Sequence, residues 1–295
     1  MVYRQVAALS ALLLLVWPVV GADAAGTPAV AALQVALLRK GVYAGAVDGV
    51  AGPLTRAAVR RLQARDSLVV DGIAGPETRR ALGPFARHTL GLRVLRPGDR
   101  GWDVAEAQFE LAWDGFPSGA FDGDFGPHLA GAVRRFQRAR ALRVDGAIGP
   151  QTLAALREPT VAPPLRLRRP VDAPLGDRFG PRGDRFHAGV DFPAPAGTPV
   201  TAAASGRVVW SGPRDGWGVL VTLADGGGIR TLYAHLETIA VRLGEHVAAG
   251  ALVGRVGATG DATGPNLHFE VRAGGAAVDP APLLARGMRA EVSVR

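Results

Sequence analysis

The chain of 295 residues contains no cysteine, and Lys40 is its one lysine. Without cysteine there is neither a disulfide framework nor a lipid-modified cysteine that could tether the protein. The formal charge of +8 is therefore almost wholly due to arginine. Such a charge attracts anionic surfaces and polymers. The arginines are dispersed and form no single basic run, so we expect no nucleic acid as a partner.

Long apolar runs are also lacking beyond the first 20 residues. There, Arg4 precedes an apolar run at 6–20, and small residues at 22–24 match a cleavage pattern, as in a secretory signal peptide. A run of this length that contains Pro18 falls short of the roughly 20 residues that span a membrane. We predict a signal peptide at 1–24 and a mature chain without a transmembrane segment. It is expected to be secreted or associated with the cell wall, or periplasmic where there is an outer membrane.

A repeat occupies the next part of the chain. The motif Asp48–Pro53 (DGVAGP) returns as Asp122–Pro127 (DGDFGP), and Asp71–Pro76 (DGIAGP) returns in the same register from Asp145. Asp-Gly is a turn signal, and the proline that follows suits the first turn of a helix, where no N–H is needed. Because apolar residues recur at helical spacing around these turns, each copy is predicted to form three short helices. The two predicted modules span residues 27–84 and 96–157.

Both modules resemble the peptidoglycan-binding domain that accompanies many bacterial wall hydrolases. The resemblance covers about 29–82 and 103–156 and implies peptidoglycan as the partner of both modules. Two modules on one chain raise avidity for a polymer if both engage. The arginine pairs at 60–61 and 134–135 leave two interpretations open: contacts to stem-peptide carboxylates or anionic wall polymers, or a solvated helix face.

The chain changes character beyond the second module. A segment rich in proline and arginine at 158–170 predicts a semi-rigid linker. Behind it, β-prone runs alternate with turns of Gly, Asp and Pro, which favours a mainly antiparallel β domain at 171–285, followed by a tail at 286–295. The predicted strands cover residues 206–210, 219–223, 229–235 and 251–256. The predicted fold class is thus multidomain α + β.

Two stretches of this β domain carry side chains of the metal-ligand type. In one, apolar and polar residues alternate, so that Asn266, His268 and Glu270 share the polar face of a predicted strand. In the other, His187 and Asp191 lie in a segment whose glycine and prolines argue against a helix, and extended backbone places both on one face. Two histidines and a carboxylate suit zinc. Three protein ligands with an open fourth position are typical of catalytic zinc.

These stretches resemble signatures of the LytM/lysostaphin-type zinc endopeptidases, over roughly residues 170–284. The similar segments are Phe186–Gly197 (FHAGVDFPAPAG), Thr231–Leu236 (TLYAHL) and Thr259–Val271 (TGDATGPNLHFEV). By this resemblance, His187, Asp191 and His268 are the metal ligands, and His235 is a catalytic histidine beside the metal. The implied cofactor is zinc.

Further side chains are candidates for roles near this site. Tyr233 is expected on the same face of its strand as His235, where it either binds substrate or packs against neighbours. Arg182 is a candidate for binding a substrate carboxylate. Glu270 either orients a ligand histidine, as carboxylates beside metal sites do, or forms a surface ion pair. The remaining histidines are expected at the surface: His88, His128 and His246.

One position departs from the family pattern, because Asn266-Leu267-His268 stands where the family has His-x-His. Asparagine cannot accept a proton at neutral pH, and a general acid or base typically contributes about 100- to 10,000-fold in rate. Two functions therefore remain open. The first is a monomeric zinc endopeptidase that cleaves peptidoglycan stem peptides or cross-bridges, with His235 and Asn266 as catalytic residues. The second is a weakened or inactive LytM-like protein that binds the wall or regulates another hydrolase.

Overall fold

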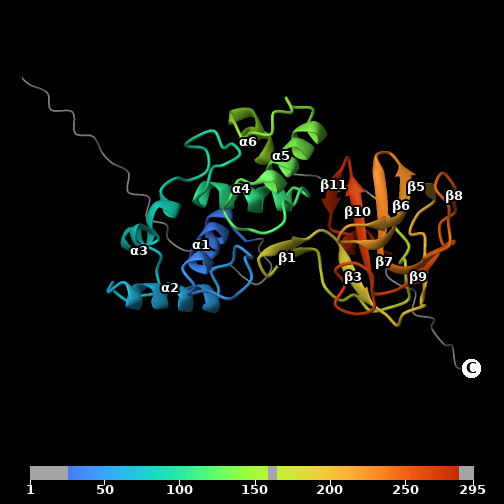
Figure 1. Cartoon of the computed structure of the whole chain (residues 1–295), viewed down its shortest axis with the longest axis horizontal. Helices are drawn as coiled ribbons and strands as arrows, with labels where there is room; N and C mark the ends of the chain where they lie inside the picture. The colour runs from blue at the N-terminus through green and yellow to red at the C-terminus, as the bar shows by residue number, and fades with distance from the viewer. Residues whose placement is uncertain (1–25, 159–164, 286–295) are drawn as a thin grey trace, which may run out of the picture.

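The computed structural model describes residues 26–158 and 165–285. The predicted signal peptide at 1–24 and the predicted tail at 286–295 lie outside the described residues. A helical part and a β part lie next to each other along the long axis of the molecule (Figure 1). Within the two described ranges, no helix is long and apolar enough to cross a membrane.

Each repeat forms three α-helices, as its turn motifs predict. A proline begins every one of these helices except α4, and its fixed φ and missing N–H suit that position. The first repeat contains α1 (Pro28–Arg39), α2 (Pro53–Arg65), α3 (Pro76–Ala81) and the 3-10 helix η1 (Gly83–Ala86). The second repeat contains α4 (Trp102–Trp113), α5 (Pro127–Ala139) and α6 (Pro150–Leu156).

Each Asp-Gly turn is held by a buried glutamine of the preceding helix. Gln137 of α5 donates from Nε2 to Asp145 Oδ1 (2.8 Å) and to the Ala147 carbonyl (2.9 Å), and its Oε1 accepts from the Gly146 N–H (2.9 Å). The other turns repeat this arrangement: Gln34 with Asp48 and Gly49, Gln63 with Asp71 and Gly72, and Gln108 with Asp122 and Gly123. Because these polar groups bond within the module, the repeated motif serves the turn rather than a ligand.

The two modules pack together through α1 and α4, their equivalent first helices. Ala105 and Phe109 of α4 belong to the same buried cluster as Leu33 and Leu37 of α1. The opposite face of α4 contributes Leu111 to the core of the second module. Since α4 is buried on both faces and completes the core of the first module, we treat α1–α6 as one helical unit.

The β part is mainly an antiparallel sheet, as predicted. Its longer strands are β5 (Gly206–Arg214), β6 (Gly218–Gly226), β7 (Ile229–Ile239), β9 (Leu252–Val256) and β10 (Asn266–Ala273). Its shorter strands are β3 (Val190–Pro193), β4 (Pro199–Thr201), β8 (His246–Val247) and β11 (Ala276–Val278), and a 3-10 helix η2 (Ala281–Leu283) follows. The four predicted strands correspond to β5, β6, β7 and β9. A separate hairpin of β1 (Gly180–Arg182) and β2 (Arg185–His187) reaches toward the helical unit (Figure 1).

One face of the sheet covers the hydrophobic core of the β part. Phe192 of β3, Tyr233 of β7 and Phe269 of β10 are completely buried there. Leu167 also lies in this core, and its N–H donates to the Leu283 carbonyl (2.8 Å). The predicted linker at 158–170 therefore ends earlier than expected among the described residues, because Leu167 already packs in the β part. Residues 159–164 of that segment lie outside the described ranges.

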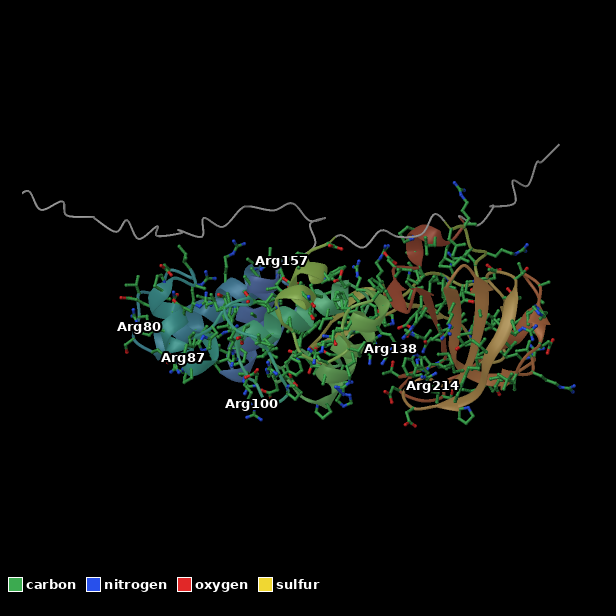
Figure 2. All side chains as sticks on the ribbon, turned by 90° about the horizontal axis from the view of Figure 1, so that it is seen from above. Arg80, Arg87, Arg100, Arg138, Arg157 and Arg214 are labelled. Carbon is green, nitrogen blue, oxygen red and sulfur yellow. The ribbon has the colours of Figure 1, made fainter. Side chains whose placement is uncertain are left out.

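Arginine is spread over both parts, as the sequence indicates. Figure 2 shows labelled arginines on different segments of the helical part and at the near side of the β part, all of them exposed: Arg80, Arg87, Arg100, Arg138, Arg157 and Arg214. The positive charge therefore belongs to the surface as a whole rather than to one groove.

The glutamine of a turn can be tested in the second module. Replacing Gln137 by Ala leaves the Gly146 N–H and the Asp145 carboxylate without their buried partner, and we expect a loss of about 1–3 kcal/mol in the free energy of unfolding. Urea unfolding followed by circular dichroism measures this loss. Gln151→Ala is the control, because Gln151 is exposed on α6. Equal stability of the two variants would contradict a structural role for the motif.

Candidate metal centre

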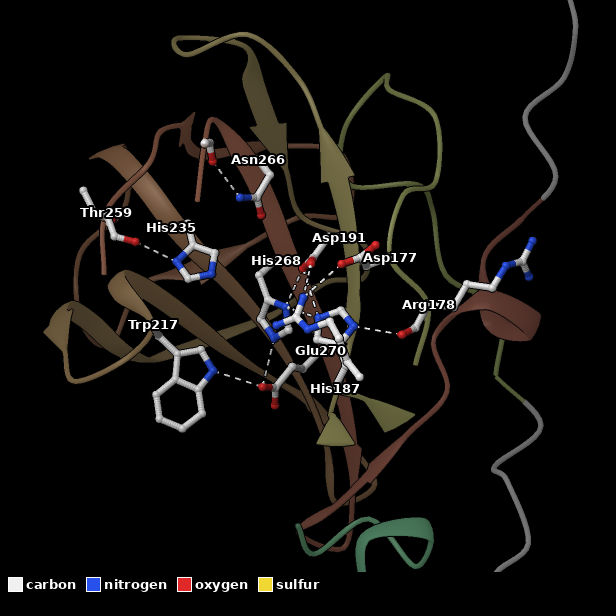
Figure 3. A network of polar contacts seen from close by, with 12 residues as sticks. Asp177, Arg178, His187, Asp191, Trp217, His235, Thr259, Asn266, His268 and Glu270 are labelled. Carbon is white, nitrogen blue, oxygen red and sulfur yellow. Dashed lines mark hydrogen bonds and ion pairs between the residues drawn. The ribbon is translucent and has the colours of Figure 1, made fainter. Parts of the chain in front are cut away.

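Three strands bring the predicted ligands to one point. His187 ends β2, Asp191 lies in β3, and the antiparallel register places Asp191 directly opposite His268 of β10. Directly opposed residues project from the same face of a sheet. His187 Nε2 lies 3.1 Å from Asp191 Oδ1 and 3.0 Å from His268 Nδ1, and the last two atoms are 2.8 Å apart (Figure 3). Among the residues that the structure describes, this is the one group close enough to share a metal ion.

Neighbouring acceptors fix the tautomers of both histidines. His187 Nδ1 lies 2.9 Å from the Arg178 carbonyl, and His268 Nε2 lies 3.1 Å from Glu270 Oε1. These oxygens only accept hydrogen bonds, so each of the two nitrogens carries a hydrogen. The other nitrogen of each ring therefore turns its lone pair toward the Asp191 carboxylate. Two lone pairs and an anionic oxygen this close repel one another unless a cation lies between them, and the donor set is one that zinc prefers. The residues thus fit zinc.

Glu270 holds His268 in this orientation from a buried position. The Trp217 indole N–H donates to Glu270 Oε1 (3.0 Å), and the Arg272 guanidinium donates two hydrogen bonds to Oε2 (2.8 and 2.7 Å). Burial by itself would raise the pKa of Glu270, but the Arg272 charge and the bond from His268 lower it to about 2. Glu270 is thus an anion at neutral pH that orients the ligand ring. It also forms an ion pair, with Arg272, but this pair is buried at Glu270 and does not lie at the surface as the second interpretation has it.

The same charges act on the ligands of a metal-free site. Burial would lower the pKa of His268, but the hydrogen bonds with Asp191 and Glu270 raise it to about 9. Burial would raise the pKa of Asp191, but the bonds from both histidines lower it. A proton on His268 therefore takes the place of the cation when no metal is bound.

His235 reaches the site through an unusual backbone conformation. Its φ of 60° lies in the left-handed region, which is uncommon for residues other than glycine. The ring donates from Nδ1 to the Thr259 carbonyl (2.7 Å), and its centroid lies 5.7 Å from that of His268. Figure 3 shows the other nitrogen, Nε2, on the side of the ligands. Burial lowers the pKa of His235, which keeps the ring neutral at neutral pH.

Tyr233 does not share a face with His235, so this expectation is wrong. Its side chain is completely buried, and the hydroxyl donates to Thr231 Oγ1 (3.0 Å) and accepts from the Ala203 N–H (2.8 Å). The register pairs Tyr233 with Phe269 on the core side. Strand alternation would place residue 235 there too, but the left-handed φ of His235 breaks it. Tyr233 is therefore a core residue out of reach of a substrate.

Arg182 forms an ion pair with the predicted ligand Asp191. Its Nη1 lies 3.1 Å from Asp191 Oδ2 and 3.1 Å from Asp177 Oδ2, while more than half of the side chain remains exposed. The oxygen that it binds is the one that does not face the histidines. Arg182 therefore orients the Asp191 carboxylate, and a contact with substrate stays a prediction.

Asn266 begins β10 on the same face as His268. Its Nδ2 donates to the Gly264 carbonyl (2.8 Å). Its Oδ1 is buried and has no hydrogen-bond partner among the described residues, although nearly all buried polar groups have one. Figure 3 shows this oxygen on the side of His235 and Asp191. Asn266 thus presents an acceptor to the site.

Sequence reasoning missed three residues that shape the site through single contacts. Thr259 and Arg178 act through their backbone carbonyls, which bind His235 and His187. Every residue type has a backbone carbonyl, so these roles leave no signal in the sequence, although Thr259 lies inside a segment that resembles the family. Trp217 comes from a turn far from the ligands in the sequence. Of the three histidines expected at the surface, His128 and His246 are exposed, and His88 is half-buried.

Comparison with known proteins divides the chain as the repeats and strands do. Residues 185–280 match the model of peptidase family M23, and residues 26–82 and 100–156 match the model described as "Putative peptidoglycan binding domain". The catalytic domain of lysostaphin from Staphylococcus simulans is 36% identical, with 37% of this chain and 90% of that domain aligned at a TM-score of 0.36.

Two relatives also match a part of the chain. The DD-carboxypeptidase/endopeptidase Mpg of Neisseria meningitidis is 41% identical over 112 residues, which are 37% of this chain and 26% of that protein. The murein hydrolase activator EnvC of Escherichia coli is 36% identical over 119 residues, which are 40% of this chain and 28% of that protein. The chain thus spans only about a quarter of the length of these relatives.

The orienting role of Glu270 can be measured as metal affinity. Glu270→Gln keeps the size of the side chain but removes the anion that binds His268 and Arg272, and we expect zinc to bind about 10- to 100-fold more weakly. Competition with a chromophoric chelator measures the dissociation constant. The control is Glu245→Gln, because Glu245 is exposed and bonds to the Arg242 N–H. Unchanged zinc affinity in Glu270→Gln would refute the role.

The pKa of His268 predicts how zinc binding depends on pH. Because this pKa is raised to about 9, zinc must displace a proton from His268 at lower pH. From the ordinary histidine pKa of about 6.5 upward, the apparent affinity is expected to rise about tenfold per pH unit and to level off above about 9. Chelator competition across this range measures the slope. A flat profile would mean that the ring gives up no proton to the metal.

Proposed function

The C-terminal part of this chain belongs to peptidase family M23 and follows two peptidoglycan-binding modules, and from this premise we propose that the protein is a zinc-dependent endopeptidase of peptidoglycan. Its substrate is the peptide part of the wall, in stem peptides or cross-bridges. The observation that carries this proposal is the convergence of His187, Asp191 and His268 within 3.1 Å of one another. We further propose that the protein is secreted or associated with the cell wall, where such a substrate lies.

Zinc held by these three side chains would supply a Lewis acid that polarises a peptide carbonyl and lowers the pKa of a bound water to about 7. The chain's own part is proton transfer. His235 Nδ1–H is committed to the Thr259 carbonyl, so Nε2 is the free acceptor of the neutral ring. We assign His235 Nε2 to take a proton from the attacking water. The protonated ring can then donate a hydrogen bond to the oxyanion of the tetrahedral intermediate.

Asn266 fills the place of the usual second histidine. Its amide cannot take a proton, but its unpartnered Oδ1 can accept a hydrogen bond from a water or from a substrate N–H. In this role it orients a reactant without moving a proton. The proposal is therefore a peptidase with one proton-transfer residue, His235, where the family pattern has two histidines.

A second function is favoured by the same residue. If Asn266 makes turnover too slow to cleave the wall, the protein binds the wall and regulates another hydrolase. The relative EnvC is described as a murein hydrolase activator, which supports this alternative. Intact metal ligands support the first function, because binding alone does not need a site for zinc.

The two functions differ in how Asn266 variants behave on defined muropeptides. We expect the wild-type protein to release peptide products in the presence of zinc and His268→Ala to release none. Asn266→His restores a second proton acceptor and is expected to raise kcat/KM by about 100-fold or more. Chromatography of the digests measures the rates.

A control and one result decide between the two functions. His246→Ala is the control, because His246 is exposed on β8 and contacts Arg207. Its rate should equal that of the wild type. Product from Asn266→His alone, with zinc-loaded wild type inert, would replace the peptidase by the regulatory function.

A further inference from the structure

The hairpin β1–β2 leaves the β part and is bound by the helical unit. Its turn, Gly183-Asp184, lies between the two modules (Figure 1). The Val47 N–H of the first module donates to the Gly183 carbonyl (2.8 Å), and the Phe121 N–H of the second module donates to the Asp184 carbonyl (2.6 Å). Val47 and Phe121 each directly precede the Asp-Gly turn of their repeat. Equivalent positions of the two repeats thus bind consecutive carbonyls of one turn.

Aromatic side chains continue this contact along the hairpin. Trp113, the last residue of α4, lies edge-on to Phe186 of β2 (ring centroids 5.3 Å apart) and to Phe179 just before β1 (6.4 Å). Phe186 is buried in the core cluster of the first module, against which Phe179 also packs. Ala120 of the second module forms an antiparallel bridge with Arg185. The hydrophobic core of the helical unit therefore includes residues of the β part.

The residues held in this way are neighbours of the metal site. Phe186 directly precedes the predicted ligand His187, and Phe179 directly follows Arg178, whose carbonyl fixes the tautomer of His187. The same hairpin carries Arg182, which binds the carboxylate of Asp191. A shift of the hairpin would thus displace one ligand and release the side chain that orients a second.

We propose that the helical unit is a structural part of the metal site, with Trp113 as a positioning residue for His187. The modules bind the hairpin through hydrogen bonds from the N–H groups of Val47 and Phe121 and through packing of the Trp113 ring. Edge-to-face aromatic pairs contribute about 0.5–1.5 kcal/mol each beyond the area that they bury. Because Phe186 directly precedes His187, these pairs fix the backbone from which the ligand ring projects. This inference rests on the proposed zinc site.

The proposal gives the repeat a second role. A wall-binding module joined only by a flexible segment could take many positions relative to the metal site. Here the second module also contacts β11: the Ala277 N–H donates to the Gly115 carbonyl (2.9 Å). The φ of Gly115 is 86°, in the left-handed region. A Cβ at Gly115 would lie 2.2 Å from the Ala277 carbonyl oxygen, so this approach requires glycine. Wall binding and the metal site then keep a fixed distance.

Zinc affinity of full-length variants tests the role of Trp113. Trp113→Ala removes the ring that packs on both Phe179 and Phe186, and we expect zinc to bind about tenfold more weakly in chelator competition. Trp113→Phe keeps an aromatic edge and is expected to restore the affinity to within about threefold. Trp210→Ala is the matched control, because Trp210 is a similarly exposed tryptophan (39% against 37%) on β5. Wild-type affinity in Trp113→Ala would overturn the proposal.

A second measurement uses the wild-type chain and does not depend on the folding of a variant. If the modules stabilise the zinc-bound hairpin, zinc must stabilise the contact of the hairpin with the modules to the same extent, because coupling is reciprocal. Hydrogen exchange of the Val47 and Phe121 amides is therefore expected to slow when zinc is added. Protection gained only within the β part would overturn the proposal. A wild-type chain that binds no zinc would instead overturn the proposed function.

Discussion

The central constraint on the site is that the fold holds His187, Asp191 and His268 close together although their facing atoms repel one another. His187 and His268 turn lone pairs toward the Asp191 carboxylate because the Arg178 carbonyl and Glu270 occupy the opposite nitrogens. Such an arrangement is stable only with a positive charge at its centre, as a proton on His268 or as a metal ion. The sheet has to supply the energy that holds the ligands in place, and it does so by pairing β3 with β10 directly across the site.

The charge balance of the site extends beyond the ligands. Glu270 is buried as an anion between His268, Trp217 and Arg272, and Arg182 neutralises the outer oxygen of Asp191. A buried carboxylate without such partners would become protonated. Arg272 and His268 keep Glu270 ionised, whereas the hydrogen bonds from His187 and His268 lower the pKa of Asp191. The charge of the site thus depends partly on residues that are not among the predicted ligands.

The hairpin β1–β2 joins this balance to the helical unit. Its turn is bound by both modules, and its aromatic residues lie in their core. The two repeats pack through α1 and α4, which places their equivalent loops side by side at the hairpin turn. The repeat thus has a structural role within the chain, since the loops that precede the first Asp-Gly turn of each module bind the turn of the hairpin.

The sequence by itself determined the local structure and the kind of chemistry. Turn motifs with proline fixed where four helices begin, alternation fixed the polar face of β10, and the residue types of His187, Asp191 and His268 indicated zinc. These features depend on a few neighbouring residues, so they can be read along the chain.

Only the tertiary structure decided which side chains meet. The left-handed backbone at His235 turned this ring to the site and left Tyr233 in the core, against the alternation that the sequence predicts. Leu167 packs in the β part although its segment is rich in proline and arginine. The contact between the modules and the hairpin includes hydrogen bonds between backbone N–H and carbonyl groups, and a backbone carbonyl is present in every residue type. Contacts of this kind depend on chain geometry and long-range packing, so no local sequence pattern predicts them.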